Sequence, residues 1–273
     1  MPSISFVKMS AAGNDFIIIE PAGKRDNQRL AQRMCHRTSG IGADGLILLE
    51  KSSRADFRMR IFNADGSEAE MCGNGVRCLA TYIRIFKKIN KKSLSIATQA
   101  GLVLTKVAET TARVRLTDPK DFKAHIPVTI SHRTLHVHYI DTGVPHTVIF
   151  VDNLKDLDVK TIGRQIRFHK KFAPRGTNVN FVEQQGPGRI AIRTYERGVE
   201  DETLACGTGS AAAALITFAQ ANPSVHDRNN IPVAVQTAGE HLLNIHFDLS
   251  QGIFKNVWLE GPTLIIAKGL FFV

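Results

Sequence analysis

Two short segments in opposite halves of the chain carry the same residue types in the same order. Each is a cysteine, then Gly-x-Gly, then an apolar run of helical spacing: Cys72-Gly73-Asn74-Gly75-Val76 and Cys206-Gly207-Thr208-Gly209-Ser210. The unpaired N–H groups and partial positive charge of a helix N-terminus bind a carboxylate and stabilise a thiolate. Two such helix ends facing one carbon would place a sulfur on each side of it. That arrangement suits removal of a proton from one face and return of a proton to the other.

The glycines in these segments indicate close approach of a ligand to the backbone, because glycine in a first helical turn otherwise costs stability. An amino-acid α-proton is far less acidic than a cysteine thiol, so the site must stabilise a developing carbanion and exclude water. A two-base reaction needs one thiolate and one thiol, whose titrations are coupled. We expect no cofactor, since no Schiff-base lysine with a phosphate-binding loop and no dinucleotide-binding glycine motif stands out.

The two remaining cysteines have a different interpretation. Cys35 and Cys78 lie on apolar faces of predicted helices, where free cysteine usually packs as a small apolar residue. Five residues separate Cys72 from Cys78 and none of them is histidine. This spacing does not fit a structural zinc site, so no metal is expected.

Length and composition predict two domains and no membrane span. The chain has 273 residues, 43% of them hydrophobic, and no apolar run of about 18 residues. The first residues show no basic and then apolar leader, so we expect no signal peptide, a cytoplasmic location and reduced thiols. The net charge of +10 makes nucleic acid a partner to consider. We interpret the densest basic cluster, 84–92, as a solvated helix end, because no zinc-finger, helix-turn-helix or RNA-binding pattern accompanies it.

The apolar periodicity predicts strands and helices in a similar order in both halves. In the first half we expect a hairpin over 3–20, a helix over 27–37, strands over 46–50 and 57–63, a helix over 73–88 and two strands within 93–117. In the second half we expect a linker over 119–127, strands over 136–141 and 146–151, a helix over 157–168, strands over 178–183 and 189–195, a helix over 207–221 and two further strands.

The halves also share shorter similarities. Residues 13–17 resemble 177–182, and residues 61–63 resemble 194–196. Strands dominate each half and short turns join many of them. We therefore predict an α+β fold in which an antiparallel or mixed sheet wraps around one buried helix in each half.

At this point the motifs resemble a known family. Residues 63–78 resemble the first signature of the diaminopimelate epimerase family, and residues 195–209 resemble the second. Segments 13–16, 40–44 and 178–181 also match, so the resemblance runs in order over most of the chain. It implies two pseudo-symmetric lobes with the active site in the cleft between them. The first lobe would be residues 1–118 together with the returning segment 263–273, and the second would be residues 119–262.

The resemblance also implies an activity and the residues that perform it. The activity is pyridoxal-independent interconversion of LL- and meso-diaminopimelate, toward lysine and peptidoglycan, by a protein that is a homodimer in many members. Its partner is a small amino acid. Cys72 and Cys206 would be the acid/base residues. The backbone at Gly73, Asn74, Gly207 and Thr208 would hold the reacting carboxylate, and Asn14, Asn63, Asn178, Glu196 and Arg197 would bind the rest of the substrate. His146 could assist proton transfer, orient Glu196 or simply pack.

Two positions depart from a common form of the family pattern. Many members have Gly-Asn-Pro-His where this chain has Gly143-Val144-Pro145-His146, and many have Asp-Gln where it has Asp44-Gly45. Both missing side chains are amides expected at the distal end of the substrate. We therefore hypothesise a less strict reading of that end. The alternatives are a racemase of another amino acid, of glutamate or proline type, and a basic binding protein without catalysis.

Overall fold

The computed structural model describes residues 2–21, 23, 25–108 and 111–273. Contacts divide the chain into two compact units, Met1–Arg115 with Gly261–Val273 and Leu116–Glu260. Each unit is a sheet packed against helices, which confirms the predicted α+β class. Among the described residues, no helix has the length and apolar character needed to cross a membrane.

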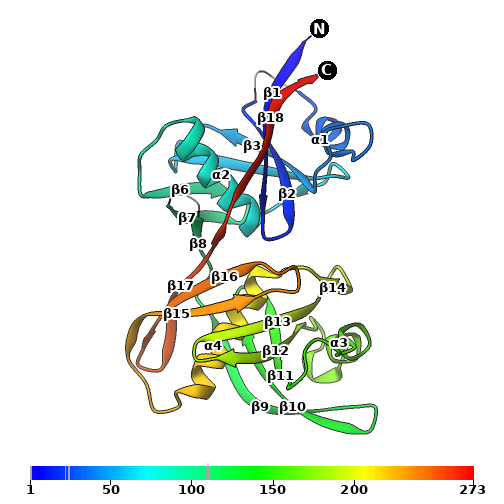
Figure 1. Ribbon diagram of the computed structural model, residues 1–273, viewed down its shortest axis with the longest axis vertical. Coiled ribbons are helices and arrows are strands. Elements are labelled where there is room, and N and C mark those ends of the chain that lie inside the picture. The colour runs from blue at the N-terminus through cyan, green and yellow to red at the C-terminus, as the bar shows by residue number, and fades with distance from the viewer. Residues whose placement is uncertain (1, 22, 24, 109–110) are drawn as a thin grey trace. The chain divides into compact units, whose positions relative to one another are not determined.

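The sheet of the first unit has the strand order β18, β1, β2, β3, β4, β6, β7, β8, and the short β5 pairs with β4. The β2–β3 and β4–β6 pairs are parallel and the others are antiparallel. Figure 1 shows β18, from the C-terminus, lying along β1. The strands are β1 (Ser3–Ala11), β2 (Asn14–Ile19), β3 (Gly45–Glu50), β4 (Phe57–Asn63), β5 (Glu68–Ala69), β6 (Ser93–Thr98), β7 (Gly101–Val107), β8 (Thr111–Arg115) and β18 (Leu264–Phe272).

Two helices cover this sheet. Helix α1 (Asn27–Cys35) begins at Asp26, whose carboxylate accepts a 3.1 Å hydrogen bond from the Arg29 N–H, and it packs on β3 and β4. Helix α2 (Gly73–Phe86) packs on β1, β2, β7 and β8. Cys35 and Cys78 are buried on the apolar faces of these helices. Their packing role therefore agrees with the sequence interpretation.

The sheet of the second unit has the order β9, β10, β11, β12, β13, β15, β16, β17, and the short β14 pairs with β13. Here the β11–β12 and β13–β15 pairs are parallel. The strands are β9 (Lys120–Ile130), β10 (Arg133–Asp141), β11 (Pro145–Phe150), β12 (Asn178–Gly186), β13 (Arg189–Glu196), β14 (Asp201–Thr203), β15 (Arg228–Gln236), β16 (Leu242–Ser250) and β17 (Ile253–Pro262). The helices are α3 (Val159–Arg167), the 3-10 turn η1 (Lys170–Phe172) and α4 (Gly207–Ala221).

The two units repeat one topology. The series β10, β11, α3, β12, β13, β14, α4, β15 has the same pairings as β1, β2, α1, β3, β4, β5, α2, β6. Likewise β9 pairs with β10 as β18 pairs with β1. Helices α2 and α4 therefore occupy equivalent places, and each begins directly after one of the repeated cysteines.

Four expectations from the sequence are wrong. The predicted linker over 119–127 is the first part of strand β9, whose side chains are mostly exposed and therefore show no apolar alternation. Segment 93–117 holds three strands rather than two, and four strands rather than two follow α4. Helices α1, α2 and α3 are shorter than predicted, whereas α4 has the predicted bounds.

Candidate active site

Cys72 caps the N-terminus of helix α2. Its backbone is extended, with φ −141°, and the helix starts at the next residue. Burial raises the pKa of the Cys72 thiol above its usual value, and the Asn74 and Gly75 N–H groups, which face the sulfur, and the charge of Arg77 act in the opposite direction. The half-buried Cys72 sulfur therefore lies where a helix end can stabilise a thiolate.

Cys206 caps helix α4 in the same way, with φ −119°. The Thr208 and Gly209 N–H groups face its sulfur, and Thr208 Oγ1 lies 3.5 Å from it. Burial and the nearby Glu196 carboxylate raise the pKa of this thiol to about 11. The two cysteines thus share a local geometry but differ in their charged neighbours.

Strand register shows which residues of the two units are equivalent. In the first unit, β2 and β3 pair Phe16 with Gly45, and Gly45 pairs with Asn63 on β4. In the second unit, His146 on β11 pairs with Asn178 on β12. The next residue, Val179, pairs with Tyr195 on β13, so Asn178 lies opposite Glu196. The equivalent pairs are therefore Asn14 with Val144, Gly45 with Asn178, and Asn63 with Glu196.

This register corrects one similarity found in the sequence. Segment 13–17 resembles segment 177–182, but the first lies on β2 and the second on β12, which is the counterpart of β3. Asn14 and Asn178 are therefore not equivalent positions of the repeat. Each unit carries one of these two amides, on a different strand.

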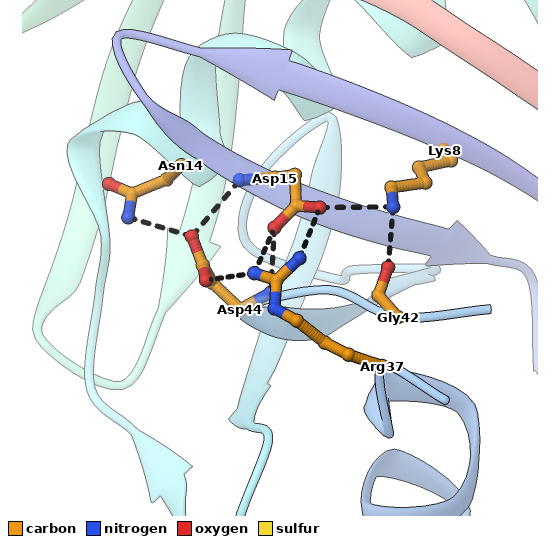
Figure 2. Close-up of polar contacts among 6 residues, drawn as sticks. All are labelled: Lys8, Asn14, Asp15, Arg37, Gly42 and Asp44. Atoms are coloured by element: carbon orange, nitrogen blue, oxygen red, sulfur yellow. Dashed lines mark hydrogen bonds and ion pairs between the residues drawn. The ribbon is translucent and has the colours of Figure 1, made fainter. Parts of the chain in front are cut away.

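In the first unit, Asn14 and Asn74 are joined by a hydrogen bond. The Asn74 amide donates to Asn14 Oδ1 over 2.8 Å, and Asn14 Nδ2 donates to the Asp44 carboxylate over 3.0 Å. Figure 2 shows Asp44 also accepting from the Arg37 guanidinium, which bridges it to Asp15. Both amides are therefore held in one orientation next to the Cys72 helix end.

Beyond Asn14, the same cluster is anchored by Lys8. Its ammonium lies 3.0 Å from Asp15 and donates to the Gly42 carbonyl over 2.6 Å (Figure 2). The Arg37 and Lys8 bonds hold the pKa of Asp15 below its usual range, against the desolvation that raises it. This cluster supports β2 and the residues that precede β3.

Asn63 is the least enclosed candidate of this unit. It ends β4, and its side chain donates to Ser67 Oγ over 2.9 Å within an exposed turn. The Asn63 amide therefore lies near the start of β3 but takes no part in the hydrogen bonds that join Asn74, Asn14 and Asp44.

In the second unit, Asn178 links β11 to the end of β13. Its Oδ1 accepts from the Arg197 N–H over 2.8 Å, and its Nδ2 donates to the Pro145 carbonyl over 3.0 Å. Arg197 also donates from its guanidinium to the Arg175 carbonyl over 3.3 Å. The Glu196 carboxylate accepts from Thr203 Oγ1 over 2.9 Å, and burial raises its pKa.

His146 is fully buried and neutral. Its Nδ1 lies 3.1 Å from Asn180 Nδ2, and Thr194 donates to Asn180 Oδ1, which fixes the orientation of that amide. Nδ1 therefore accepts, and the ring proton is assigned to Nε2. Burial and the Arg197 charge lower the pKa of His146 to about 3. Among the described residues its hydrogen bond goes to Asn180 and not to Glu196.

Sequence reasoning assigned no role to several residues that hold these groups. In the first unit, Asp44 accepts a hydrogen bond from the Asn14 amide and Arg77 donates one to Asn74. In the second unit, Asn180 is hydrogen-bonded to His146, and Thr203 donates to Glu196. Asn180 did leave a signal, because it is a polar residue inside a buried apolar strand. Among the described residues, no group of three or more His, Cys, Asp or Glu side chains could hold a metal.

This chain is similar to known proteins over most of its length. The sequence model of the family described as Diaminopimelate epimerase matches residues 6–120 and 138–252. The diaminopimelate epimerase of Hydrogenobaculum sp. is 40% identical over 281 residues, 96% of each chain. That of Chlorobaculum tepidum is 40% identical over 265 residues, 96% of this chain and 98% of its own.

Solved structures share the fold at low sequence identity. A phenazine biosynthesis protein of Bacillus anthracis has a TM-score of 0.75 at 17% identity, covering all of both chains. A hydroxyproline epimerase of Agrobacterium vitis has a TM-score of 0.66 at 13% identity, covering 98% of this chain and 92% of its own. With two helix-capping cysteines on a duplicated topology and full-length relatives at this identity, the chain belongs to the diaminopimelate epimerase family of isomerases.

Proposed function

We propose that this chain epimerises LL-diaminopimelate to meso-diaminopimelate without a cofactor, for lysine and peptidoglycan synthesis. One observation carries the proposal: each unit begins a buried helix directly after the same capping cysteine, in a member of the epimerase family. The relatives named above are diaminopimelate epimerases and match nearly the whole chain.

In the proposed reaction the α-carbon of the substrate loses one proton and gains another on its opposite face. A cysteine thiolate takes the α-proton and becomes a thiol, and the electron pair stays on the α-carbon beside the carboxylate. The second cysteine then gives its thiol proton to the opposite face and becomes a thiolate. Cys72 and Cys206 are the two groups, and neutral His146 supplies no charge to either step.

The helix ends supply the stabilisation that this carbanion needs. The first N–H groups of α2 and α4, at Gly73 and Asn74 and at Gly207 and Thr208, have no intrahelical partners. We propose that they donate to the reacting carboxylate, onto which the negative charge spreads. The glycines leave room for that carboxylate to approach the backbone.

The remaining candidates suit the other end of a diamino dicarboxylate. Arg197 can pair with a carboxylate through two N–H groups, and Glu196 can bind an ammonium. We propose that Asn14, Asn63 and Asn178 complete the contacts. The fixed orientations of the Asn14 and Asn178 amides support this, because a preorganised donor loses little freedom when substrate binds.

Val144 and Gly45 support a broader specificity. They occupy the repeat positions equivalent to Asn14 and Asn178, so each unit offers one amide where a second is usual for the family. A Cβ at Gly45 would lie 2.9 Å from the Phe62 carbonyl oxygen, so the local backbone favours glycine. We propose that the distal end of the substrate is read less strictly, and that this chain also racemises a shorter dicarboxylic amino acid such as glutamate.

A substrate panel in heavy water tests these proposals. Single stereoisomers of diaminopimelate, glutamate and proline are incubated with the enzyme in D₂O and the inverted products are analysed for deuterium. We expect inversion of diaminopimelate with one deuterium at the α-carbon, and slower inversion of glutamate. Inversion of glutamate or proline alone would establish the racemase alternative. Inversion of none would refute the catalytic proposal.

We further propose that the enzyme is a cytoplasmic homodimer whose lobes are residues 1–118 with 263–273 and residues 119–262. Four free cysteines support a reducing compartment. Apolar side chains exposed along β18, including Leu264, Ile266, Leu270 and Phe272, support burial against a second copy. Sedimentation at micromolar concentration tests the dimer, and a monomer mass would exclude it.

A further inference from the structure

Arg77 is a buried cation close to the Cys72 helix end. It is 0% exposed, and its guanidinium donates over 2.7 Å to Asn74 Oδ1 and over 3.3 Å to the Pro262 carbonyl. Its Nε has no hydrogen-bond partner, and no carboxylate in the described part of the chain forms an ion pair with it. A buried charge of this kind is costly unless an anion compensates it. The ionisable groups that act on Arg77 are the thiols of Cys72 and Cys78.

The second unit lacks this cation. Arg77 is the fifth residue after Cys72, and the fifth residue after Cys206 is the buried Ala211. Because α2 and α4 occupy equivalent places in the repeat, the difference is one of charge at matching positions. Cys206 thus has the same capping geometry as Cys72 without a guanidinium behind it.

The strand ends next to the cysteines differ in the same direction. Glu196 acts on Cys206 and raises the pKa of its thiol, whereas the equivalent position in the first unit is the neutral Asn63. An anion thus opposes a thiolate at Cys206, and a cation favours one at Cys72. Two independent substitutions in the repeat therefore have effects of the same sign.

The other ionisable groups around the cysteines do not reverse this difference. Asp44 raises the pKa of Cys72 as the smallest of the influences on it, and its carboxylate is already bonded to Arg37. Cys78 stays a thiol because burial raises its pKa to about 12. In the second unit, Arg197 acts on His146 and lowers its pKa.

We propose that Arg77 is a positioning residue that decides which cysteine is ionised, so that the resting enzyme holds a thiolate at Cys72 and a thiol at Cys206. The inference rests on the proposed two-cysteine reaction. Arg77 acts through its charge and through Asn74, whose N–H faces the Cys72 sulfur and whose side chain it holds. After one inversion the proton has moved from Cys206 to the product and Cys72 carries the substrate proton. Exchange of protons with solvent then restores the resting state.

Site-resolved alkylation of the intact enzyme tests the proposal. Initial rates of iodoacetamide labelling are measured between pH 6 and 10, and each cysteine is quantified by peptide mass. Because thiolates react and thiols do not, a difference of one pKa unit gives about a tenfold difference in rate. We expect Cys72 to label at least about tenfold faster than Cys206 near neutral pH. The buried Cys35 and Cys78 serve as internal controls and should stay unlabelled.

Charge-removing variants locate the cause. Arg77→Met should slow labelling of Cys72, Glu196→Gln should speed labelling of Cys206, and the ratio should approach one when both are combined. Arg77→Lys should restore most of the Cys72 rate. Arg84→Met is the matched control on the same helix, because Arg84 donates to the Val107 carbonyl and has no contact with the cysteine. It should leave the ratio unchanged.

A kinetic readout separates a charge effect from a loss of structure. In Arg77→Met the acidic limb of the kcat/KM pH profile should move to higher pH, which a purely structural defect would not cause. Equal labelling of both cysteines in the wild type, faster labelling of Cys206, or a folded Arg77→Met with the wild-type ratio would overturn the proposal. If Arg77→Met fails to fold, the wild-type, Arg77→Lys and Glu196→Gln ratios still decide. Failure of the proposed function would appear instead as no inversion of any stereoisomer, whatever the labelling ratio.

Discussion

Gly209 and Asn180 lie so close that a Cβ built on the glycine would be 2.4 Å from Asn180 Oδ1. The same atom would be 3.3 Å from the Cys206 sulfur. Asn180 has little freedom to move, because its amide donates to the Thr147 carbonyl and accepts from Thr194. The glycine therefore lets a buried amide pack directly behind the capping cysteine.

Gly209→Ala should lower the free energy of unfolding by about 1–3 kcal/mol, the usual cost of overpacking a rigid site. Urea denaturation measures it. Gly73→Ala is the matched control, since the nearest atom to its Cβ, Val114 Cγ1, is 4.0 Å away. The control should be at least as stable as the wild type, because alanine is the better helix former. Equal stability of Gly209→Ala and the wild type would contradict the packing argument.

Cys72→Ser and Cys206→Ser should each lower epimerisation by about 10²-fold or more, because a hydroxyl is a much weaker acid than a thiol in general acid–base catalysis. The measurement is deuterium incorporation into the inverted product. Cys35→Ser, a change on the packed face of α1, is the comparison and should retain activity if the protein folds. A near wild-type rate in either of the first two variants would exclude the two-base assignment.

His146 should make stability depend on pH between about 6.5 and 3. Its pKa falls from 6.5 to about 3 on folding, so the unfolded chain binds the proton more readily. The folded state therefore has its full stability above pH 6.5 and loses it as the pH falls, by up to about 1.4 kcal/mol per unit. Unfolding is compared at pH 7.5 and 5.0 in the wild type and in His146→Gln. The wild type should lose about 2 kcal/mol more than the variant, and equal losses would show that His146 does not titrate as described.

A mild oxidant should inactivate the enzyme reversibly by joining Cys72 to Cys206. A disulfide requires Cα atoms within about 7 Å, so the prediction is that the two thiols can approach each other once no substrate carbon separates them. Non-reducing peptide mapping should find the cross-linked pair, and a thiol reductant should restore activity. Either Cys→Ser variant should prevent the cross-link. An enzyme that keeps full activity in oxidant, with no cross-link, would argue against facing cysteines.

The sequence predicted the starts of α2 and α4 correctly because Cys-Gly-x-Gly marks a helix end and an apolar run follows it. It failed for β9, where exposed side chains and Pro127 hide a strand that pairs with β10. Periodicity detects burial on one face, and this strand buries little apart from Val128.

The sequence named the candidate residues, which remain predictions, but it did not indicate the contacts between them. In the sequence, Asn14 and Asn178 look like repeats of one segment. Strand register shows instead that Asn14 is equivalent to Val144 and that Asn178 is equivalent to Gly45. Arg77 gave no signal either, because its hydrogen bonds go to an amide and to a carbonyl 185 residues away in sequence. Contacts of that range depend on the completed fold.

The pairing of β18 with β1 sets an order of events during synthesis. The second unit is continuous, so it can fold once residue 260 has left the ribosome, whereas the first unit lacks a strand until the last residues emerge. A released fragment of residues 1–260 should therefore resist protease over 116–260 while β1 still offers unpaired backbone groups. Protection of β1 at that length would contradict this sequence of folding, under which the earliest part of the polypeptide is the last to be completed.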